Sequence, residues 1–310
     1  MQGFSILQGD IMVTESESLT GGNEERMAFP QARTILKAGL PPLSTLKLLI
    51  MAAAGSRPRY RKVCLALLRP FTHHSEVAIH YFCHARRYVV LVRIADLESD
   101  WYSVNEIAVR KIYSIDSGFV PDLVIDGGGN TGLFTLFAAA AFPSAKIVTC
   151  EPVPRNLRQI EKHLRINGVT AEVQPVCIGG SERKIPFYVR EANQGSFDPE
   201  LPYSSRIDVG VVTLASLLRG RSAGRILIKL DIEGMEVEAL ESLVPGETRP
   251  IFVVGEVHNF QTNRGVLERI FARSGWTVRF ENADVMTSGF VACSPAALPM
   301  LVDQQVAVAS

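Results

Sequence analysis

The stretch that most constrains the fold is residues 122–132, with the sequence DLVIDGGGNTG. It begins with the apolar run Leu123-Val124-Ile125, which predicts a short buried strand, and the glycines after Asp126 mark where that strand ends. The mostly apolar residues 133–137 and the alanines after them predict a helix. A glycine turn between a strand and a helix lets a ligand approach the backbone, and the helix N-terminus presents free N–H groups. The segment therefore predicts a nucleotide-cofactor site.

Composition favours a folded protein with a full core. The chain has 310 residues, of which 47% are hydrophobic, and its 32 basic and 32 acidic residues give a formal net charge of zero. A neutral chain gives no reason to expect a nucleic acid or an anionic membrane as the partner. The cysteines are scattered without a CxxC pair, which favours buried, reduced thiols in a cytoplasmic protein. They are Cys64, Cys83, Cys150, Cys177 and Cys293.

We expect three regions along the chain. Residues 1–25 are polar and aperiodic, which predicts a flexible tail, and they lack the pattern of a signal peptide. Residues 26–116 predict an N-terminal cap of helices with a β-hairpin over 75–83 and 87–95. The longest apolar run near the N-terminus is far shorter than the roughly 20 residues of a transmembrane helix, so we expect no membrane span. An apolar cap of this kind could form a homodimer face.

Residues 117–310 predict the cofactor-binding domain, because strands and helices alternate from Pro121 onward. This alternation is typical of an α/β fold with a doubly wound, mostly parallel sheet. The last two strands suggest a closing antiparallel hairpin. The expected strands after the first are residues 146–151, 172–178, 226–231, 251–257, 277–281 and 290–293, with two short extra strands at 184–189 and 208–212.

Two cofactors fit the glycine turn. Gly127, Gly129 and Gly132 match GxGxxG, and Glu151 ends the next strand, which is also the pattern of a nicotinamide-dependent oxidoreductase. Asp126 directly before the glycines would oppose a pyrophosphate. It suits a cofactor without phosphates and with a cationic amino-acid end, such as S-adenosylmethionine, although a helix-capping role is the structural alternative.

Further acids follow a later pair of strands. Asp231 lies at the carboxyl end of the strand in ILIKLDIEGME (residues 226–236), where α/β sheets bind ligands. We expect a structural role for Lys229, while Glu236 fits a solvated helix face. Glu256 and His258 follow the next strand two residues apart, which places both on one face.

The candidates for the catalytic base are Asp231, Glu256 and His258. The unperturbed pKa of histidine suits that role, although a loop histidine without chemistry is equally open. Asp231, Glu233 and Glu256 could also contribute oxygen ligands to a divalent cation. Their spacing along the chain shows no dedicated cluster, so the sequence predicts no metal site.

Four segments together resemble the FkbM-like methyltransferase family: VIDGGGNTG, the Cys150-Glu151-Pro152 step, the helix ending in Asn167, and IKLDIEGMEVEALES. The resemblance covers roughly residues 75–260. It implies a Rossmann-like class I methyltransferase fold with a seven-stranded sheet and S-adenosyl-L-methionine as the methyl donor. It also implies O-methylation of a hydroxyl group on a sugar, a polyketide or another natural product, with a small molecule or glycan as acceptor. A methyltransferase fold that binds a ligand without catalysis is a further alternative.

The resemblance also implies roles for single residues. Asp126 is expected to hold the methionine end of the cofactor, Glu151 the ribose hydroxyls, and Ile178 the adenine. On this reading Asp126→Ala abolishes cofactor binding with little effect on folding. The family more often has alanine at the position of Gly128, so Gly128 is expected to loosen the turn. The complete expected cofactor set is Asp126, Gly127, Gly128, Gly129, Asn130, Gly132, Glu151, Pro152, Ile178 and Asp231.

Overall fold

The structure is a computed structural model that describes residues 35–36, 40, 42–56, 61–84, 86–110, 113, 118–190, 195–197, 200, 202–281 and 287–298. The expected tail, residues 1–25, lies outside the described residues.

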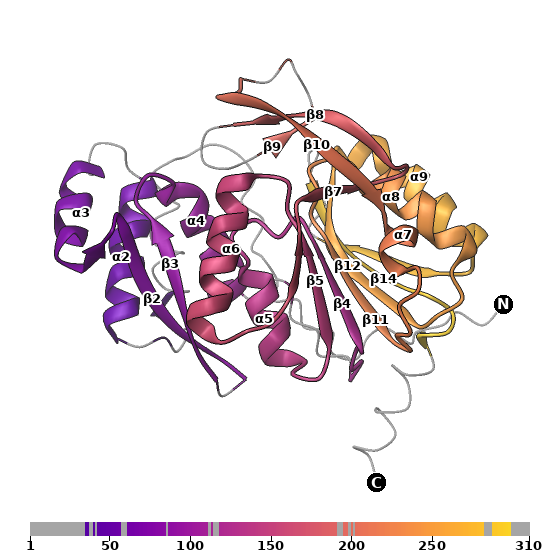
Figure 1. The fold of residues 1–310 in the computed structure, drawn as a ribbon, viewed down its shortest axis with the longest axis horizontal. Coiled ribbons are helices and arrows are strands. Elements are labelled where there is room, and N and C mark those ends of the chain that lie inside the picture. The colour runs from indigo at the N-terminus through magenta and orange to yellow at the C-terminus, as the bar shows by residue number, and fades with distance from the viewer. Residues whose placement is uncertain are drawn as a thin grey trace, which may run out of the picture.

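A seven-stranded sheet forms the centre of the molecule, with the strand order β13-β14-β12-β11-β4-β5-β6 (Figure 1). The pairs from β12 to β6 are parallel, and β14 runs antiparallel between β12 and β13. This confirms the doubly wound, mostly parallel sheet and its closing hairpin. The strands are β4 (Leu123–Gly127), β5 (Lys146–Cys150), β6 (Glu172–Gln174), β11 (Ile226–Leu230), β12 (Ile251–His258), β13 (Thr277–Glu281) and β14 (Thr287–Cys293).

The central strands are continuous apolar runs because helices cover both faces of the sheet. Every residue of β4 and β11 is buried. Leu123 and Ile125 pack with the helices on one face, whereas Val124 packs with Phe134 on the other, as alternation along a strand requires. The first face carries α7 (Leu214–Leu218), α8 (Glu236–Leu243) and α9 (Phe260–Arg273), and the second carries α5 (Leu133–Ala141) and α6 (Pro154–Asn167).

Strand order reverses between β4 and β11. From β4 the chain adds β5 and β6 on one side and later adds β11 and β12 on the other side. In open α/β sheets, ligands bind at the carboxyl ends of the strands beside such a reversal. The fold alone therefore places the site where β4, β5, β11 and β12 end.

The N-terminal cap packs beside α5 and α6 (Figure 1). Its two long strands pair antiparallel, which confirms the predicted hairpin. After the hairpin, an α-helix over residues 97–104 continues into a π-helical turn over residues 105–110. The cap elements are α2 (Pro42–Ser56), α3 (Arg61–Leu68), η2 (Arg69–Phe71), β1 (Thr72–His73), β2 (Glu76–Cys83), β3 (Arg86–Arg93), α4 (Leu97–Val104) and η3 (Asn105–Arg110).

Side chains of α6 bind the open edge of β3 and fix the cap to the domain. Asn167 accepts from the Val89 N–H at 2.7 Å and donates to the Val89 carbonyl at 2.8 Å. One turn earlier, His163 Nε2 accepts from the Leu91 N–H at 2.9 Å. Gln159 donates to the Leu91 carbonyl at 2.8 Å. Residues four apart share one helix face, so α6 takes the place of a neighbouring strand.

A second sheet, with the order β7-β10-β8-β9, lies above the carboxyl edge of the first (Figure 1). Residues 172–178 were expected to form one strand, and that prediction is wrong: Pro175 divides them into β6 and β7, which belong to different sheets. Proline has no N–H and cannot continue a ladder of backbone hydrogen bonds. The expected short strands 184–189 and 208–212 are longer and belong to this sheet. Its strands are β7 (Val176–Gly179), β8 (Arg183–Val189), β9 (Gly195–Ser196) and β10 (Ser205–Thr213).

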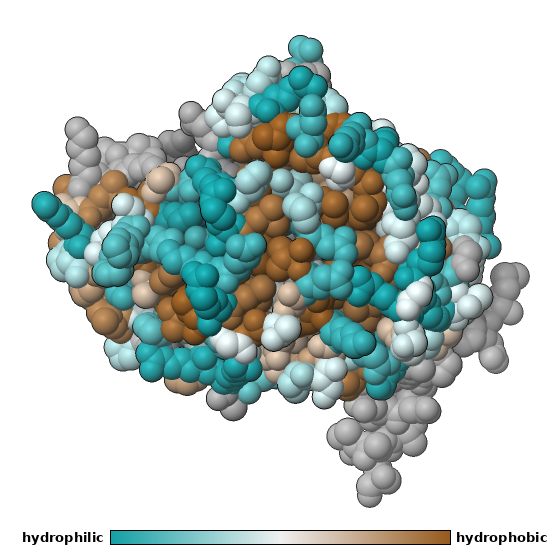
Figure 2. All heavy atoms as spheres, viewed as in Figure 1, coloured by the Kyte–Doolittle hydropathy of each residue, from teal (hydrophilic) through white to brown (hydrophobic). Residues whose placement is uncertain are grey.

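Three further expectations concern the cysteines, the homodimer and the absence of a membrane span. All five cysteines are free and four are buried, as predicted. On the face shown in Figure 2, hydrophobic residues interrupt the hydrophilic surface over α2 and α3, where Leu43, Leu46, Val63 and Leu67 are exposed. The homodimer that we expected from the apolar cap stays a prediction. Within the part of the chain that the structure describes, no helix is both long and apolar enough to cross a bilayer.

Candidate functional site

A cavity of about 320 Å³ lies at the carboxyl ends of β4, β5, β11 and β12. Its wall combines the glycine turn, the helices of the cap and the second sheet. The sequence-predicted residues that line it are Gly128, Gly129, Asn130, Glu151, Pro152, Ile178, Asp231, Glu256 and His258.

The glycine turn is tightly packed. Gly128 has a φ of 74°, and a Cβ added there would lie 1.9 Å from the carbonyl oxygen of Asp231. The N–H groups of Gly128 and Gly129 both donate to the Cys150 carbonyl, at 3.1 and 2.9 Å. The expectation that Gly128 loosens the turn is therefore wrong, because only glycine fits between β4 and β11 at this point.

Asp126 lies behind the cavity wall, contrary to expectation. Its side chain is fully buried, and its Oδ2 accepts a hydrogen bond from the Thr135 hydroxyl at 2.6 Å. Asp126 is not among the residues that line the cavity, and neither are Gly127 and Gly132. The carboxylate of Asp126 therefore supports the turn from below, and the structure does not bring it to a ligand.

Lys229 connects this buried acid to the turn. Its Nζ donates to the carbonyls of Gly127 and Gly128 at 3.2 and 2.7 Å. The same Nζ lies 3.7 Å from Asp126 Oδ1 and 3.8 Å from Asp231 Oδ2. Burial opposes the charge of Lys229, but the neighbouring carboxylates outweigh burial and raise its pKa. These contacts agree with the structural role expected for Lys229.

Glu151 follows β5 and is 4% exposed. Its Oε2 accepts the Asn130 N–H at 2.8 Å, and its Oε1 accepts the Val153 N–H at 2.8 Å. Burial raises the pKa of Glu151 to about 7, because a buried carboxylate loses the solvation of its charge. A carboxylate held in this way can accept hydrogen bonds from the hydroxyl groups of a ligand in the cavity.

An apolar part of the wall lies next to Glu151. Cys177 and Ile178 of β7 line it together with Val153 and Phe187. The ring of Phe187 packs edge-on against Phe197, with 5.0 Å between the ring centroids. A flat apolar ligand group fits this part of the cavity.

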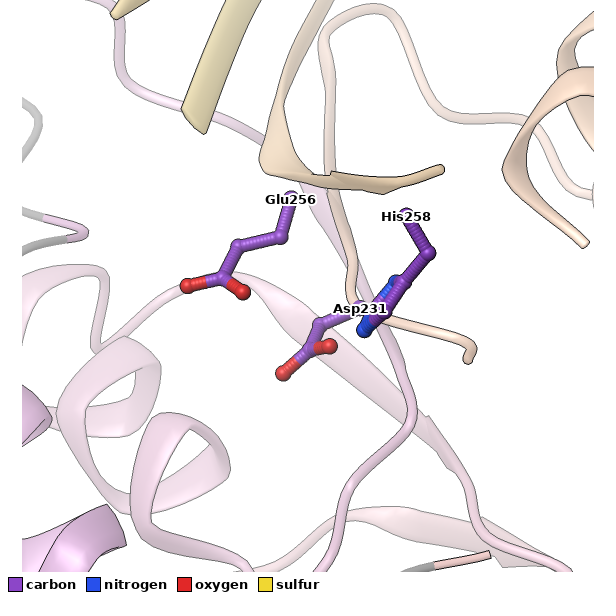
Figure 3. Close-up of side chains that lie close together, drawn as sticks. All are labelled: Asp231, Glu256 and His258. Carbon is purple, nitrogen blue, oxygen red and sulfur yellow. The ribbon is translucent and has the colours of Figure 1, made fainter. Parts of the chain in front are cut away.

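Asp231, Glu256 and His258 converge at the end of β11 and β12 (Figure 3). Each offers a ligand atom, and these atoms all lie within 4.8 Å of one another. The parallel register pairs Leu230 with Gly255, so the residues that follow, Asp231 and Glu256, lie side by side. Glu256 and His258 share a face, as their spacing predicted.

His258 is held by a second carboxylate that the sequence placed in solvent. Glu236 is fully buried, so its expected solvated position is wrong. Its Oε1 lies 3.0 Å from His258 Nδ1 and also accepts the N–H groups of Ile232 and Gly234, both at 3.1 Å. Burial lowers the pKa of His258, but the hydrogen bond to Glu236 and the charges of Glu236, Asp231 and Glu233 together outweigh burial and raise the pKa to about 9.

A pKa of about 9 favours the carboxylates over His258 as the base, because an imidazole that carries a proton at neutral pH does not accept another. Glu256 differs, because burial and the charge of Asp231 raise its pKa to about 7. The two carboxylates, Asp231 and Glu256, are therefore the groups at this end of the cavity that can accept a proton.

The cap supplies cavity residues that sequence reasoning missed. Ser103 Oγ accepts a hydrogen bond from Asn130 Nδ2 at 3.1 Å, which joins the cap to the glycine turn. Tyr102, Glu106 and Tyr113 also line the cavity. The Tyr113 hydroxyl is buried and has no hydrogen-bond partner among the described residues. The helical pattern of this segment contains no sign of these contacts, because they depend on where the cap packs.

The model of the Methyltransferase FkbM domain matches residues 126–286, just over half of the chain. Methyltransferase sdnD of Sordaria araneosa is 25% identical, and the similar segment covers 46% of this chain and 72% of that protein. Methyltransferase 1 of Beauveria bassiana is 26% identical over 45% of this chain and 65% of that protein.

Two further similarities cover smaller shares of the other protein. A segment of the AMB antimetabolite synthetase AmbE of Pseudomonas aeruginosa is 33% identical over 30% of this chain, but spans only 4% of that protein. The crystal structure of the methyltransferase FkbM of Methylobacillus flagellatus KT has a TM-score of 0.41 and 12% identity. The similar region covers 85% of this chain and 58% of that one, so the chain spans little more than half of that methyltransferase.

The domain match begins at Asp126, before the glycine turn, and includes Glu151, Asp231, Glu256 and His258. It therefore contains the acids at the ends of β5, β11 and β12, and it removes the support for a nicotinamide-dependent oxidoreductase that the glycines alone had offered. The chain belongs to the FkbM family of methyltransferases.

Proposed function

We propose that this methyltransferase uses S-adenosylmethionine to methylate a hydroxyl group of a small natural product. The observation that carries the proposal is the arrangement of one cavity. A buried acid, Glu151, lies at one end, and the acidic group of Asp231 and Glu256 lies at the other. The glycine turn lies between them. Such a cavity can hold a nucleoside at one end and place a hydroxyl against a base at the other.

The residues present fit S-adenosylmethionine. Glu151 would accept the two ribose hydroxyls, and the apolar wall around Ile178 would cover the adenine. Asn130 Oδ1 is a buried acceptor without a hydrogen-bond partner among the described residues, and it suits the ammonium group of the methionine end.

When bound, S-adenosylmethionine would supply an electrophilic methyl group for an SN2 reaction, in which the acceptor oxygen bonds to the methyl carbon as the carbon–sulfur bond breaks and S-adenosylhomocysteine leaves. The protein aligns the acceptor and removes its proton. Alignment alone contributes up to about 7–11 kcal/mol in favourable cases. Asp231 and Glu256 are the carboxylates placed to accept the hydroxyl proton, while protonated His258 offers a positive charge beside them.

The wall near these carboxylates suggests the kind of acceptor. Tyr102, Tyr113 and Phe134 contribute aromatic rings to the cavity, which suits the apolar face of a sugar or a polyketide. The similar segment within an antimetabolite synthetase also supports a natural-product acceptor. No charged groove for a polyanion is expected of a chain with zero formal net charge.

Binding of S-adenosylhomocysteine is expected to depend on pH through Glu151. The pKa of this acid is about 7, so it is largely protonated at pH 6 and ionised at pH 8. Only the ionised form accepts both ribose hydroxyls, so affinity rises with pH and is about tenfold weaker at pH 6 than at pH 8. Calorimetric titrations at the two pH values measure this. The matched variant Glu151→Gln is expected to bind weakly with no such pH dependence, and an equal pH dependence in this variant would contradict the assignment.

Glu256→Gln and Asp231→Asn are expected to affect turnover more than cofactor binding. Loss of a positioned base lowers a rate by about 10²–10⁴-fold. The affinity for S-adenosylhomocysteine should stay within about threefold, because the ribose and adenine contacts remain. Transfer of a radiolabelled methyl group to a panel of hydroxylated sugars and polyketides gives the rate, and calorimetry gives the affinity. Equal losses in both quantities would make Asp231 a cofactor ligand and remove its role at the acceptor.

A further inference from the structure

We propose that Asp231, Glu256 and His258 bind a divalent cation of the Mn²⁺ type, and that this cation holds the methyl acceptor through two of its oxygens. The sequence predicted no metal site, because it compared only the acids Asp231, Glu233 and Glu256. In the structure the third donor is an imidazole, and the three side chains lie close together (Figure 3). Two carboxylates and one imidazole form a mixed oxygen and nitrogen set that suits Mn²⁺.

The spacing of the donors is close to that of a metal site. Their ligand atoms lie within 4.8 Å of one another. Around a cation with ligands at about 2.1 Å, adjacent donors are about 3.0 Å apart and opposite donors about 4.2 Å apart. Small rotations of three half-buried side chains bring the donors to these distances.

An independent observation is the way His258 is oriented. The fully buried carboxylate of Glu236 lies 3.0 Å from Nδ1, which leaves Nε2 as the nitrogen available to a ligand. Histidines that bind metals almost always donate their other N–H to a carboxylate or carbonyl in this way. Glu236 is itself fixed by the N–H groups of Ile232 and Gly234, so the imidazole is held in place before any ligand arrives.

The local charge also favours a cation. Asp231, Glu233, Glu236 and Glu256 gather around His258, and within the described residues the neighbouring fixed cation is Lys229. Lys229 is shared with Asp126 and with two carbonyls of the glycine turn. A divalent cation would offset this excess negative charge.

A second independent observation is an unpartnered buried hydroxyl in the same cavity. Tyr113 is 7% exposed, lines the cavity with Asp231 and Glu256, and its hydroxyl has no hydrogen-bond partner among the described residues. The Lys229 Nζ lies 5.7 Å from the centre of the Tyr113 ring, which places the ring beside the acidic group. A buried hydroxyl without a partner calls for a ligand oxygen or a metal-bound water.

The cation narrows the class of acceptor. Three protein donors leave about three positions of a six-coordinate ion open. Two oxygens on adjacent carbons would fill two of them, so the acceptor would be a vicinal diol or a hydroxyl next to a carbonyl. Coordination would lower the pKa of the hydroxyl, and each carboxylate would keep its second oxygen as the acceptor of the proton. The inference about the acceptor rests on the proposed O-methyltransferase function, whereas the inference that the three side chains bind a cation does not.

The test is a calorimetric titration of the full chain, stripped with EDTA, with Mn²⁺ alone. One Mn²⁺ per chain is expected, with affinity reduced about tenfold or more in Asp231→Asn and in Glu256→Gln. The matched control is Asp208→Asn, an exposed acid on β10 that should bind Mn²⁺ as the unaltered chain does. S-Adenosylhomocysteine binding in EDTA, measured on the same samples, shows that each variant is folded.

The outcomes separate the two proposals. Absence of stoichiometric Mn²⁺ binding, or equal binding in Asp231→Asn, Glu256→Gln and Asp208→Asn, would overturn the metal site. S-Adenosylhomocysteine binding in EDTA would then still support the proposed cofactor. Loss of Mn²⁺ binding in both site variants with cofactor binding retained is the result that the proposal requires.

Discussion

Replacing Gly128 by alanine is expected to lower the free energy of unfolding by about 3 kcal/mol or more. The added methyl group would lie 1.9 Å from the carbonyl oxygen of Asp231, which is backbone and cannot rotate away. The φ of 74° adds the strain of a left-handed conformation for a residue with a Cβ. Strain and overpacking each contribute about 1–3 kcal/mol. The expected result is an unfolding transition at much lower urea concentration.

The matched control is Gly210→Ala in β10, where the nearest atom to an added Cβ is 3.8 Å away. This variant should unfold within about 1 kcal/mol of the unaltered chain. If Gly128→Ala were as stable as Gly210→Ala, the close contact between the glycine turn and β11 would be wrong. A second readout is S-adenosylhomocysteine binding, which the displaced turn should abolish.

Lys229→Met is expected to lower stability by about 3–5 kcal/mol, because it leaves the buried Asp126 carboxylate without its cation. The variant also removes the hydrogen bonds to the Gly127 and Gly128 carbonyls. Asp126→Asn should also be destabilising, which corrects the expectation that Asp126 contributes to binding alone. Asp126 is 0% exposed, and its charge depends on Lys229 and Thr135.

The double variant Lys229→Met, Asp126→Asn distinguishes an ion pair from general packing. When both charges are removed, no unpaired charge stays buried, so the double variant should lose less stability than the sum of the two single losses. For two residues in contact, the loss of stability in the double variant typically differs from the sum of the single losses by about 0.5–3 kcal/mol. Urea unfolding of the four proteins completes the cycle. Strictly additive losses would mean that Lys229 and Asp126 act separately.

Much of the fold could be predicted from local patterns. The run Leu123-Val124-Ile125 before three glycines identifies the central strand and the turn, because a strand buried on both faces is apolar throughout. The carboxyl ends of parallel strands share one edge of the sheet. Glu151, Asp231 and Glu256, each at the end of a strand, could therefore be placed at one cavity from the sequence alone.

The remaining features depend on contacts between distant segments. Pro175 ends β6, but the pattern of residues 172–178 does not show that β7 continues in another sheet. The burial of Asp126 depends on Lys229, which is more than ninety residues away along the chain. The burial of Glu236 depends on His258, which is more than twenty residues away. The pKa of His258 follows from that contact, so its unperturbed value was a poor guide to its role.

Titration calorimetry with S-adenosylhomocysteine, with NAD⁺ run beside it, shows directly whether the cavity binds S-adenosylmethionine. We expect micromolar binding of S-adenosylhomocysteine at pH 8, lost in Glu151→Gln, and no binding of NAD⁺. Binding of NAD⁺ without S-adenosylhomocysteine would overturn the proposed cofactor, and so would S-adenosylhomocysteine binding that Glu151→Gln leaves unchanged.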